Sequence, residues 1–145
     1  MVPATRKQRL LAVAIDCALV MLISLCATSE GLPEAIVLVA LAAGAVLIGA
    51  LVYLLAKYGQ TPGKRIVGIK IVKQDTFENG GFVVNVLKRG FLPSLPYFFL
   101  MLLHPVVSAA YIWTDLLMIF RQDRRCLHDI IAGTIVIQAS SDVVQ

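Results

Sequence analysis

The residue with the clearest chemical consequence is Asp16, because its carboxylate lies inside the apolar run 9–29, RLLAVAIDCALVMLISLCATS. A carboxylate inside a membrane is costly unless another group pairs with it, neutralises it or hydrates it. Arg9 begins the same run seven residues earlier, and the helical rise separates the two residues by about 10 Å along the axis. Arg9 is therefore placed to meet Asp129 or a lipid phosphate at the membrane surface, and Asp16 needs a partner of its own.

The second half of the chain supplies further ionisable side chains. Asp115 lies in the apolar run 91–120, and His128 and Asp129 stand together in the later segment LHDII. We predict a polar or ion-binding cluster of four residues: Arg9, Asp16, Asp115 and Asp129. Four more side chains are candidates to support it: Lys64, Arg65, His104 and His128. The two basic residues suit lipid head groups or carboxylates, and His104, which precedes a proline, suits a polar position at a hinge.

Two hypotheses for Asp16 are open. In the first, its carboxylate lines a cavity, binds a cation or a proton and changes protonation during transport. In the second, the carboxylate is a structural lock that accepts hydrogen bonds and fixes the helix register. The candidate partners are Ser24, Tyr111, His104, Asp115, and Lys64 and Arg65 if the TPGKR turn folds under the helices.

Several other chemistries lack the residues that they need. The three cysteines, Cys17, Cys26 and Cys126, include no CxxC pair, which supports neither a disulfide framework nor a metal site. No nucleophile and base stand in a recognisable motif, so we expect no enzyme and no catalytic residue. TPGKR lacks the spacing of a phosphate-binding loop. We expect no cofactor, and no nucleic-acid partner because no such motif occurs.

The composition indicates an integral membrane protein. Of its 145 residues, 59% are hydrophobic and 15% are charged, whereas soluble domains are about half apolar and about a quarter charged. We predict transmembrane helices at 10–28 and 35–56, joined as an antiparallel hairpin by the short turn SEGLPE at 29–34. The second helix carries two pairs of small residues spaced for close helix packing: Ala40/Gly44 and Ala45/Gly49.

The distribution of basic residues predicts the orientation of this hairpin. Lysines and arginines flank both of its ends: Arg6, Lys7 and Arg9 before it, and Lys57, Lys64, Arg65, Lys70 and Lys73 after it. The turn at 29–34 has none. The positive-inside rule therefore places the N-terminus and the segment 57–90 in the cytoplasm, beside anionic lipid head groups.

The run 91–120 is too long for one straight crossing, since 30 helical residues span about 45 Å. Three prolines interrupt it: Pro93, Pro96 and Pro105. We predict a broken or re-entrant pair of helices within 94–120, hinged near His104, rather than a single crossing. The fold-back returns the chain, and its C-terminus, to the cytoplasmic side.

Shorter elements lie between and after these helices. Residues 82–92 have the pattern of an amphipathic helix at the membrane surface, with Lys88 and Arg89 reaching to head groups. Alternating patterns at 66–73 and 134–139 predict two strands that pair in a small cytoplasmic sheet. The residues SSDVVQ at the C-terminus are predicted to be a loose end. The whole chain, 1–145, thus reads as a single, mainly α-helical, polytopic membrane domain.

Three motifs in this order resemble the RDD family of bacterial membrane proteins. They are Arg9 with Asp16 in the first helix, GQTPGKRIVGIKIV at 59–72, and RQDRRCLHDIIAGTIVI at 121–137. The family takes its name from one arginine and two aspartates, which match Arg9, Asp16 and, for the second aspartate, Asp129, with Asp115 as the competing position. The resemblance implies a multi-pass protein of the bacterial inner membrane. It also implies transport of an unidentified ligand, with cation/proton exchange suggested for some relatives.

Two functions follow as hypotheses. The first is movement of a cation or small solute with Asp16 as the protonatable site. Because one copy offers about four short membrane segments, this needs a homo-oligomer or a partner membrane protein. The alternative is a non-transporting module of the bilayer that recruits or stabilises a partner protein through its small cytoplasmic sheet.

Overall fold

The computed structural model describes residues 1–28, 33–123 and 125–139. The elements in chain order are α1 (Arg6–Thr28), α2 (Glu34–Tyr58), α3 (Pro62–Val67), β1 (Ile69–Lys73), η1 (Val83–Phe91), α4 (Leu92–Leu103), α5 (Pro105–Leu117), η2 (Met118–Phe120), α6 (Leu127–Ala132) and β2 (Thr134–Gln138). The expected fold class, mainly helical and polytopic with one small sheet, is confirmed. The predicted turn at 29–34 and the predicted loose end fall largely on residues outside the described ranges.

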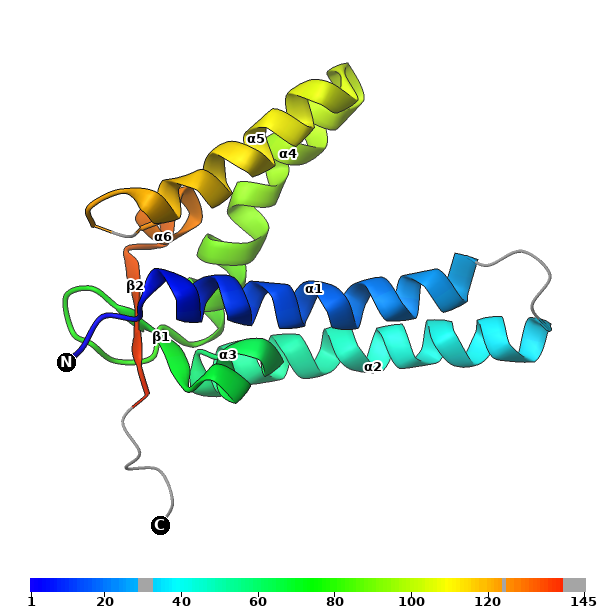
Figure 1. Ribbon diagram of the computed structural model, residues 1–145, viewed down its shortest axis with the longest axis horizontal. Helices are drawn as coiled ribbons and strands as arrows, with labels where there is room; N and C mark the ends of the chain where they lie inside the picture. The colour runs from blue at the N-terminus through cyan, green and yellow to red at the C-terminus, as the bar shows by residue number, and fades with distance from the viewer. Residues whose placement is uncertain (29–32, 124, 140–145) are drawn as a thin grey trace, which may run out of the picture.

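Three helices are long and apolar enough to cross a membrane: α1, α2 and the continuous helix Val83–Leu103, formed by η1 and α4. The helices α1 and α2 run side by side as the predicted hairpin (Figure 1). The pair Ala40/Gly44 lies at their contact, because Ala40 is buried and a Cβ on Gly44 would lie 3.5 Å from Ile23. A Cβ on Gly49 would meet no atom within 4 Å, so the second small pair faces away from α1.

The predicted surface helix at 82–92 continues directly into α4, so that it forms the first part of a helix of membrane length. Its residues Val83–Phe91 are wound as a π-helix, in which the Leu92 N–H donates to the Leu87 carbonyl, five residues back. This wider winding suits Pro93, which has no N–H to donate to the preceding turn. The side chain of Asn85 is buried and donates to the Leu55 carbonyl at 2.9 Å, which attaches η1 to the end of α2.

The predicted fold-back within 94–120 is confirmed. His104 has an extended backbone that ends α4, and Pro105 begins α5. The two helices lie side by side in opposite directions (Figure 1), and the Tyr111 hydroxyl donates to the Pro93 carbonyl at 3.0 Å. The chain therefore returns to the end of the molecule from which η1 started, where the Arg6 guanidinium donates to the Phe120 carbonyl at 3.0 Å.

The two-stranded sheet is also confirmed, with β1 antiparallel to β2 and Ile71 opposite Val136. The predicted first strand, 66–73, begins too early. Thr61 and Pro62 start the short helix α3, and Gly68, at φ +72°, ends it before β1 begins. The second predicted strand, 134–139, ends one residue earlier, at Gln138.

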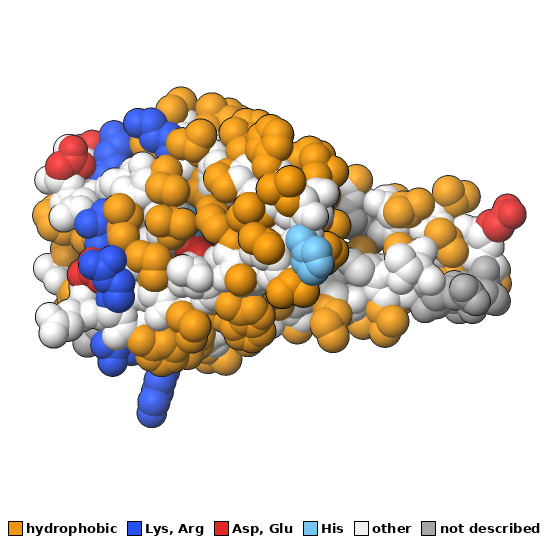
Figure 2. Space-filling model, turned by 90° about the horizontal axis from the view of Figure 1, so that it is seen from above, with side chains coloured by type: hydrophobic (Ala, Val, Ile, Leu, Met, Phe, Trp, Pro, Cys, Tyr) orange, Lys and Arg blue, Asp and Glu red, His pale blue; other side chains and the backbone are white. Residues whose placement is uncertain are grey.

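The small hydrophobic core lies where this sheet meets the start of α1. Buried side chains of both strands contact Ala4 and Ala12 there. The N-terminal residues extend the sheet, because the Ala4 N–H donates to the Val136 carbonyl and the Gln138 N–H donates to the Val2 carbonyl, each at 3.0 Å. We call this part of the molecule, formed by α3, β1, β2, α6 and the adjoining helix ends, the charged end. Figure 2 shows lysines and arginines gathered at one end and hydrophobic side chains over most of the remaining visible face.

Candidate functional site

Asp16 is bound by the TPGK turn, residues 61–64, which begins α3. The Thr61 hydroxyl donates to Asp16 Oδ2 at 2.5 Å, and the Gly63 N–H donates to Asp16 Oδ1 at 2.7 Å. The carboxylate thus accepts one charge-assisted hydrogen bond on each oxygen, and such bonds are stronger than neutral ones. The sequence suggested that the TPGKR turn folds under the helices, and it does so, with the hydroxyl and backbone rather than the basic side chains as the donors.

Local sequence preferences explain why this turn can hold a carboxylate. Thr61 is the N-cap of α3, since its hydroxyl oxygen accepts from the Lys64 N–H at 3.2 Å, and Pro62 fits the first helical position. Gly63 is required by space, because a Cβ there would lie 2.2 Å from the Ala12 carbonyl oxygen and 2.9 Å from Asp16 Oδ1. Ala12 is itself fully buried at this contact. The close approach of α3 to α1 therefore depends on two small residues.

Asp129 joins two arginines from different helices. Its side chain is fully buried, Oδ2 accepts from Arg9, and Oδ1 accepts from the Arg89 guanidinium at 2.6 Å. The Cys126 N–H also donates to Oδ2, at 3.2 Å. Burial alone would raise the pKa of Asp129, but its neighbours, Arg89 foremost among them, more than offset the effect of burial and lower the pKa to about 2. The ionised carboxylate thereby fixes α6 against α1 and η1.

His128 extends this contact to Asp115 at the end of α5. Arg89 Nη2 lies 3.1 Å from His128 Nε2, and His128 Nδ1 lies 2.7 Å from Asp115 Oδ2. Because a guanidinium can only donate, we assign Nε2 as the acceptor and place the imidazole proton on Nδ1, where it is donated to Asp115. With a neutral imidazole, the two arginines balance the two carboxylates. We call these five residues, Arg9, Arg89, Asp115, His128 and Asp129, the Asp129 network.

Lys64 lies between the two carboxylate sites. Its ammonium is 3.5 Å from the Thr61 hydroxyl, and it feels the charges of both Asp16 and Asp129. Burial is the main cause that lowers the pKa of Lys64 to about 8, and the nearby Arg89 lowers it further. Lys64 is therefore a basic side chain whose protonation can change close to neutral pH.

The structure brings most of the predicted site residues to the charged end. Arg9, Asp115, His128 and Asp129 lie in one network, and Asp16 and Lys64 lie at the adjoining TPGK turn. Two predicted supporting residues lie elsewhere. Arg65 stacks over the Tyr58 ring, 5.3 Å from its centroid. His104 is exposed at the tip of the α4–α5 hairpin, where Nδ1 accepts from the Val106 N–H at 3.2 Å.

Arg89 was missed as a site residue, since its position next to Lys88 suggested a contact with lipid head groups. The structure buries the arginine and exposes the lysine. The available signal was periodicity: Asn85 and Arg89 are four residues apart, and both face the protein interior. Of the two candidates for the second family aspartate, Asp129 contacts Arg9 directly, whereas Asp115 reaches the arginines through His128.

One set of side chains has the ligand types of a metal site. The ligand atoms of Asp115, Cys126 and His128 lie within 4.8 Å of one another. Both imidazole nitrogens, however, already have partners, Asp115 and Arg89, and the guanidinium beside Nε2 would repel a cation. Burial raises the pKa of Cys126 to about 11, so its thiol is neutral. This arrangement suits a hydrogen-bonded network better than a metal.

These features define a class: a polytopic helical membrane protein whose buried ion pairs join a small polar end to the ends of its apolar helices. The family is shown by comparison. The model of the RDD family matches residues 3–133, so the chain belongs to the RDD family. No curated protein and no solved structure matches the chain.

Proposed function

We propose that this protein is a non-transporting membrane module that recruits or stabilises a partner membrane protein. The observation that carries the proposal is the engagement of both carboxylates, the half-buried Asp16 and the fully buried Asp129. Asp16 accepts from Thr61 and Gly63, and Asp129 accepts from two arginines, all within the chain. A transport site must bind and release its ion or proton, whereas an ion or proton bound to either carboxylate would leave the donors that now hold that carboxylate unsatisfied.

The apolar helices supply the surface for such a partner. No residue of α4 is buried, and in α5 only Ser108 is buried. The α4–α5 hairpin diverges from the α1–α2 hairpin away from the charged end (Figure 1). Membrane helices associate through packing and polar contacts, and uncovered helices on two diverging hairpins offer separate faces to another protein's helices.

The proposal includes an orientation in the bacterial inner membrane, with both termini in the cytoplasm. The basic residues of the charged end, and their absence from the turn at 29–34, support it through the positive-inside rule. The sheet of the charged end would then be accessible to cytoplasmic parts of the partner.

The decisive experiment compares ion flux with partner capture. Purified wild-type protein and Asp16→Asn are reconstituted in liposomes, and proton flux is measured with gradients of Na⁺, K⁺ and other cations. We expect both to match empty liposomes. In parallel, a photo-crosslinking residue at Trp113, which is 61% exposed on α5, should form a discrete protein adduct in cells, whereas one at buried Ile119 should not. Cation-driven flux that Asp16→Asn abolishes would contradict the proposal.

Transport remains a second candidate because of Lys64. A half-buried amine with a pKa of about 8, within the electrostatic influence of Asp16 and Asp129, is a group that could exchange a proton during an ion cycle. Such a cycle would need several copies of the chain to enclose a path. If this candidate holds, Lys64→Met abolishes flux in liposomes, and Lys70→Met, which removes an equal charge from β1, leaves it unchanged.

A further inference from the structure

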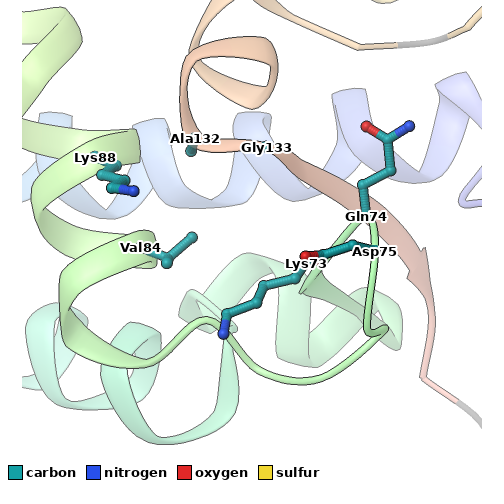
Figure 3. A pocket seen from close by; sticks show the side chains of 7 residues that line it. All are labelled: Lys73, Gln74, Asp75, Val84, Lys88, Ala132 and Gly133. Atoms are coloured by element: carbon teal, nitrogen blue, oxygen red, sulfur yellow. The ribbon is translucent and has the colours of Figure 1, made fainter.

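An open pocket of about 550 Å³ lies at the charged end between η1 and the loop that follows β1. Lys73 and Asp75 come from the strand end and the loop, Val84 and Lys88 from η1, and Gly133 from the turn before β2 (Figure 3). Its volume is in the range of small-ligand sites. The pocket is separate from the Asp129 network and the TPGK turn.

The charges of this pocket are unbalanced. Lys73 and Lys88 approach it from different elements, and within the described ranges neither ammonium has a hydrogen bond or an ion pair. The one acidic residue of the lining, Asp75, accepts from the Thr76 N–H at 2.9 Å. Two unpaired cations across a hollow favour an anion with several oxygens, such as a phosphate group.

The position of the pocket along the membrane-length helix indicates which kind of molecule would carry that phosphate. Val84 and Lys88 belong to the first turns of the membrane-length helix Val83–Leu103, so in a bilayer crossed by this helix the pocket would lie at the membrane surface. Beside it, η1 exposes apolar side chains at Val83, Leu87 and Phe91. A basic pocket next to an exposed apolar surface matches a molecule with an anionic head and apolar tails.

We propose that this pocket binds the head group of an anionic phospholipid. The phosphate lies between the ammonium groups of Lys73 and Lys88, and the acyl chains lie along the apolar side of η1. This role is independent of whether the protein transports a solute or recruits a partner. It predicts a preference for anionic over zwitterionic lipids, because the zwitterionic head carries a cation that the two lysines repel.

The test uses lipid-depleted full-length protein in detergent, with binding measured by native mass spectrometry. The probes are phosphatidylglycerol, phosphatidylcholine with the same acyl chains, and inorganic phosphate. The variant Lys73→Gln/Lys88→Gln removes the two pocket cations. The control Lys7→Gln/Lys70→Gln removes the same charge from the same end of the molecule but outside the pocket.

We expect the pocket variant to bind phosphatidylglycerol about 10- to 30-fold more weakly, on the basis of about one kcal/mol for each lysine near an anionic lipid. The control and the charge-preserving Lys73→Arg/Lys88→Arg should stay within about twofold of wild type. Each single Lys→Gln variant should show an intermediate loss, which gives a second readout if the double variant folds poorly.

Three results would overturn the assignment. Equal loss in the pocket variant and the control would mean that the attraction is spread over the whole charged end. Equal binding of phosphatidylglycerol and phosphatidylcholine would exclude an anion-selective pocket. Displacement of the lipid by inorganic phosphate at similar concentration would mean that the pocket takes a soluble anion.

Discussion

Asp129 forms ion pairs with two arginines that approach it from separate helices. A buried carboxylate with two guanidinium partners can contribute strongly to specificity, because a change in the relative position of α1, η1 or α6 would leave a charge unpaired. Asp115, which is linked to Arg89 through His128, supplies the second negative charge, so the network as a whole is balanced. At the level of residues, the polar side chains of this protein hold segments together.

The first prediction concerns removal of that central carboxylate. Asp129→Ala leaves two buried arginines without their anion, which should destabilise the protein by about 3–5 kcal/mol. Thermal unfolding in detergent should show this as a large fall in Tm. The control is Asp123→Ala, which breaks the exposed pair between Arg121 and Asp123 and should change Tm little. Similar Tm values for both variants would mean that the Asp129 network does not stabilise the fold.

The second prediction is a pH dependence. Burial alone would raise the pKa of Asp129, but its neighbours, Arg89 foremost among them, lower it to about 2, whereas an unfolded aspartate has a pKa of about 3.9. The folded state therefore binds this proton less tightly than the unfolded state. The stabilisation from Asp129 is fully present above about pH 4 and is lost as the pH falls toward about 2. Tm values of wild type and Asp129→Asn should differ at about pH 6 and converge across that window.

Among the elements, α3 is small but connects three parts of the chain. It follows α2 directly, receives Asp16 of α1 at its first turn, and ends at Gly68 so that β1 can begin. An isolated helix of this length would be unstable, so its partners must hold it in place. Asp16 and the TPGK turn are therefore one structural unit.

The third prediction tests that unit through its glycine. In Gly63→Ala, the new Cβ would lie 2.2 Å from the Ala12 carbonyl oxygen, so α3 must move away from α1 and Asp16 loses its donors. We expect a lower Tm, comparable with that of Asp16→Ala, and a double variant hardly worse than either single one. The control Gly49→Ala adds a methyl group in open space. Additive losses in the double variant would show that Gly63 and Asp16 act separately.

The fourth prediction concerns the α1–α2 contact. Gly44→Leu places a large side chain where Ile23 already lies 3.5 Å from the Cβ position. We expect overpacking to destabilise the hairpin by about 1–3 kcal/mol. Gly49→Leu, on the open side of α2, should leave the Tm of the isolated protein unchanged. A loss for Gly49→Leu instead would indicate that another helix covers that side in the purified protein.

For the whole molecule, long periodic segments were predictable from the sequence and compact polar contacts were not. Apolar length and the positions of proline were enough to predict the α1–α2 hairpin, the break at His104 and the return of the chain. The two strands were predicted from their alternating patterns, and their pairing was predicted because neither strand is stable alone. The predicted start of β1, at residue 66, was too early. Thr61 and Pro62 start the helix α3, and this helix includes the first residues of the segment that was predicted as a strand.

The sequence was enough to predict most residues of the site, but not which of these residues contact one another. Arg9 with Asp129 followed from their positions at the ends of apolar segments. The donors to Asp16 did not, because a backbone N–H and a hydroxyl carry no charge signal in the sequence. Arg89 was assigned to the lipid surface because it follows Lys88 directly, although its spacing of four residues from Asn85 indicated that the two side chains share one face of the helix.

The last prediction concerns how far the α4–α5 hairpin reaches. The helix Val83–Leu103 has 21 residues, and at the α-helical rise it spans at most about 31 Å, which approaches the thickness of a bilayer core. His104 should therefore reach the surface opposite the charged end, so that the hairpin crosses twice and is not re-entrant. To test this, Cys17 and Cys26 are replaced by alanine, and buried Cys126 is kept.

A membrane-impermeant maleimide then reports the side of each new cysteine. His104→Cys should react in intact cells, and Lys70→Cys, on β1, should react only after the membrane is opened. The two variants distinguish two alternatives, because an inverted orientation would change the labelling of Lys70→Cys and a re-entrant hairpin would change the labelling of His104→Cys. Reaction of Lys70→Cys in intact cells would show that the orientation is the reverse of the one proposed. Failure of His104→Cys to react before or after opening, in a variant that is correctly folded, would place the tip inside the bilayer and make the hairpin re-entrant.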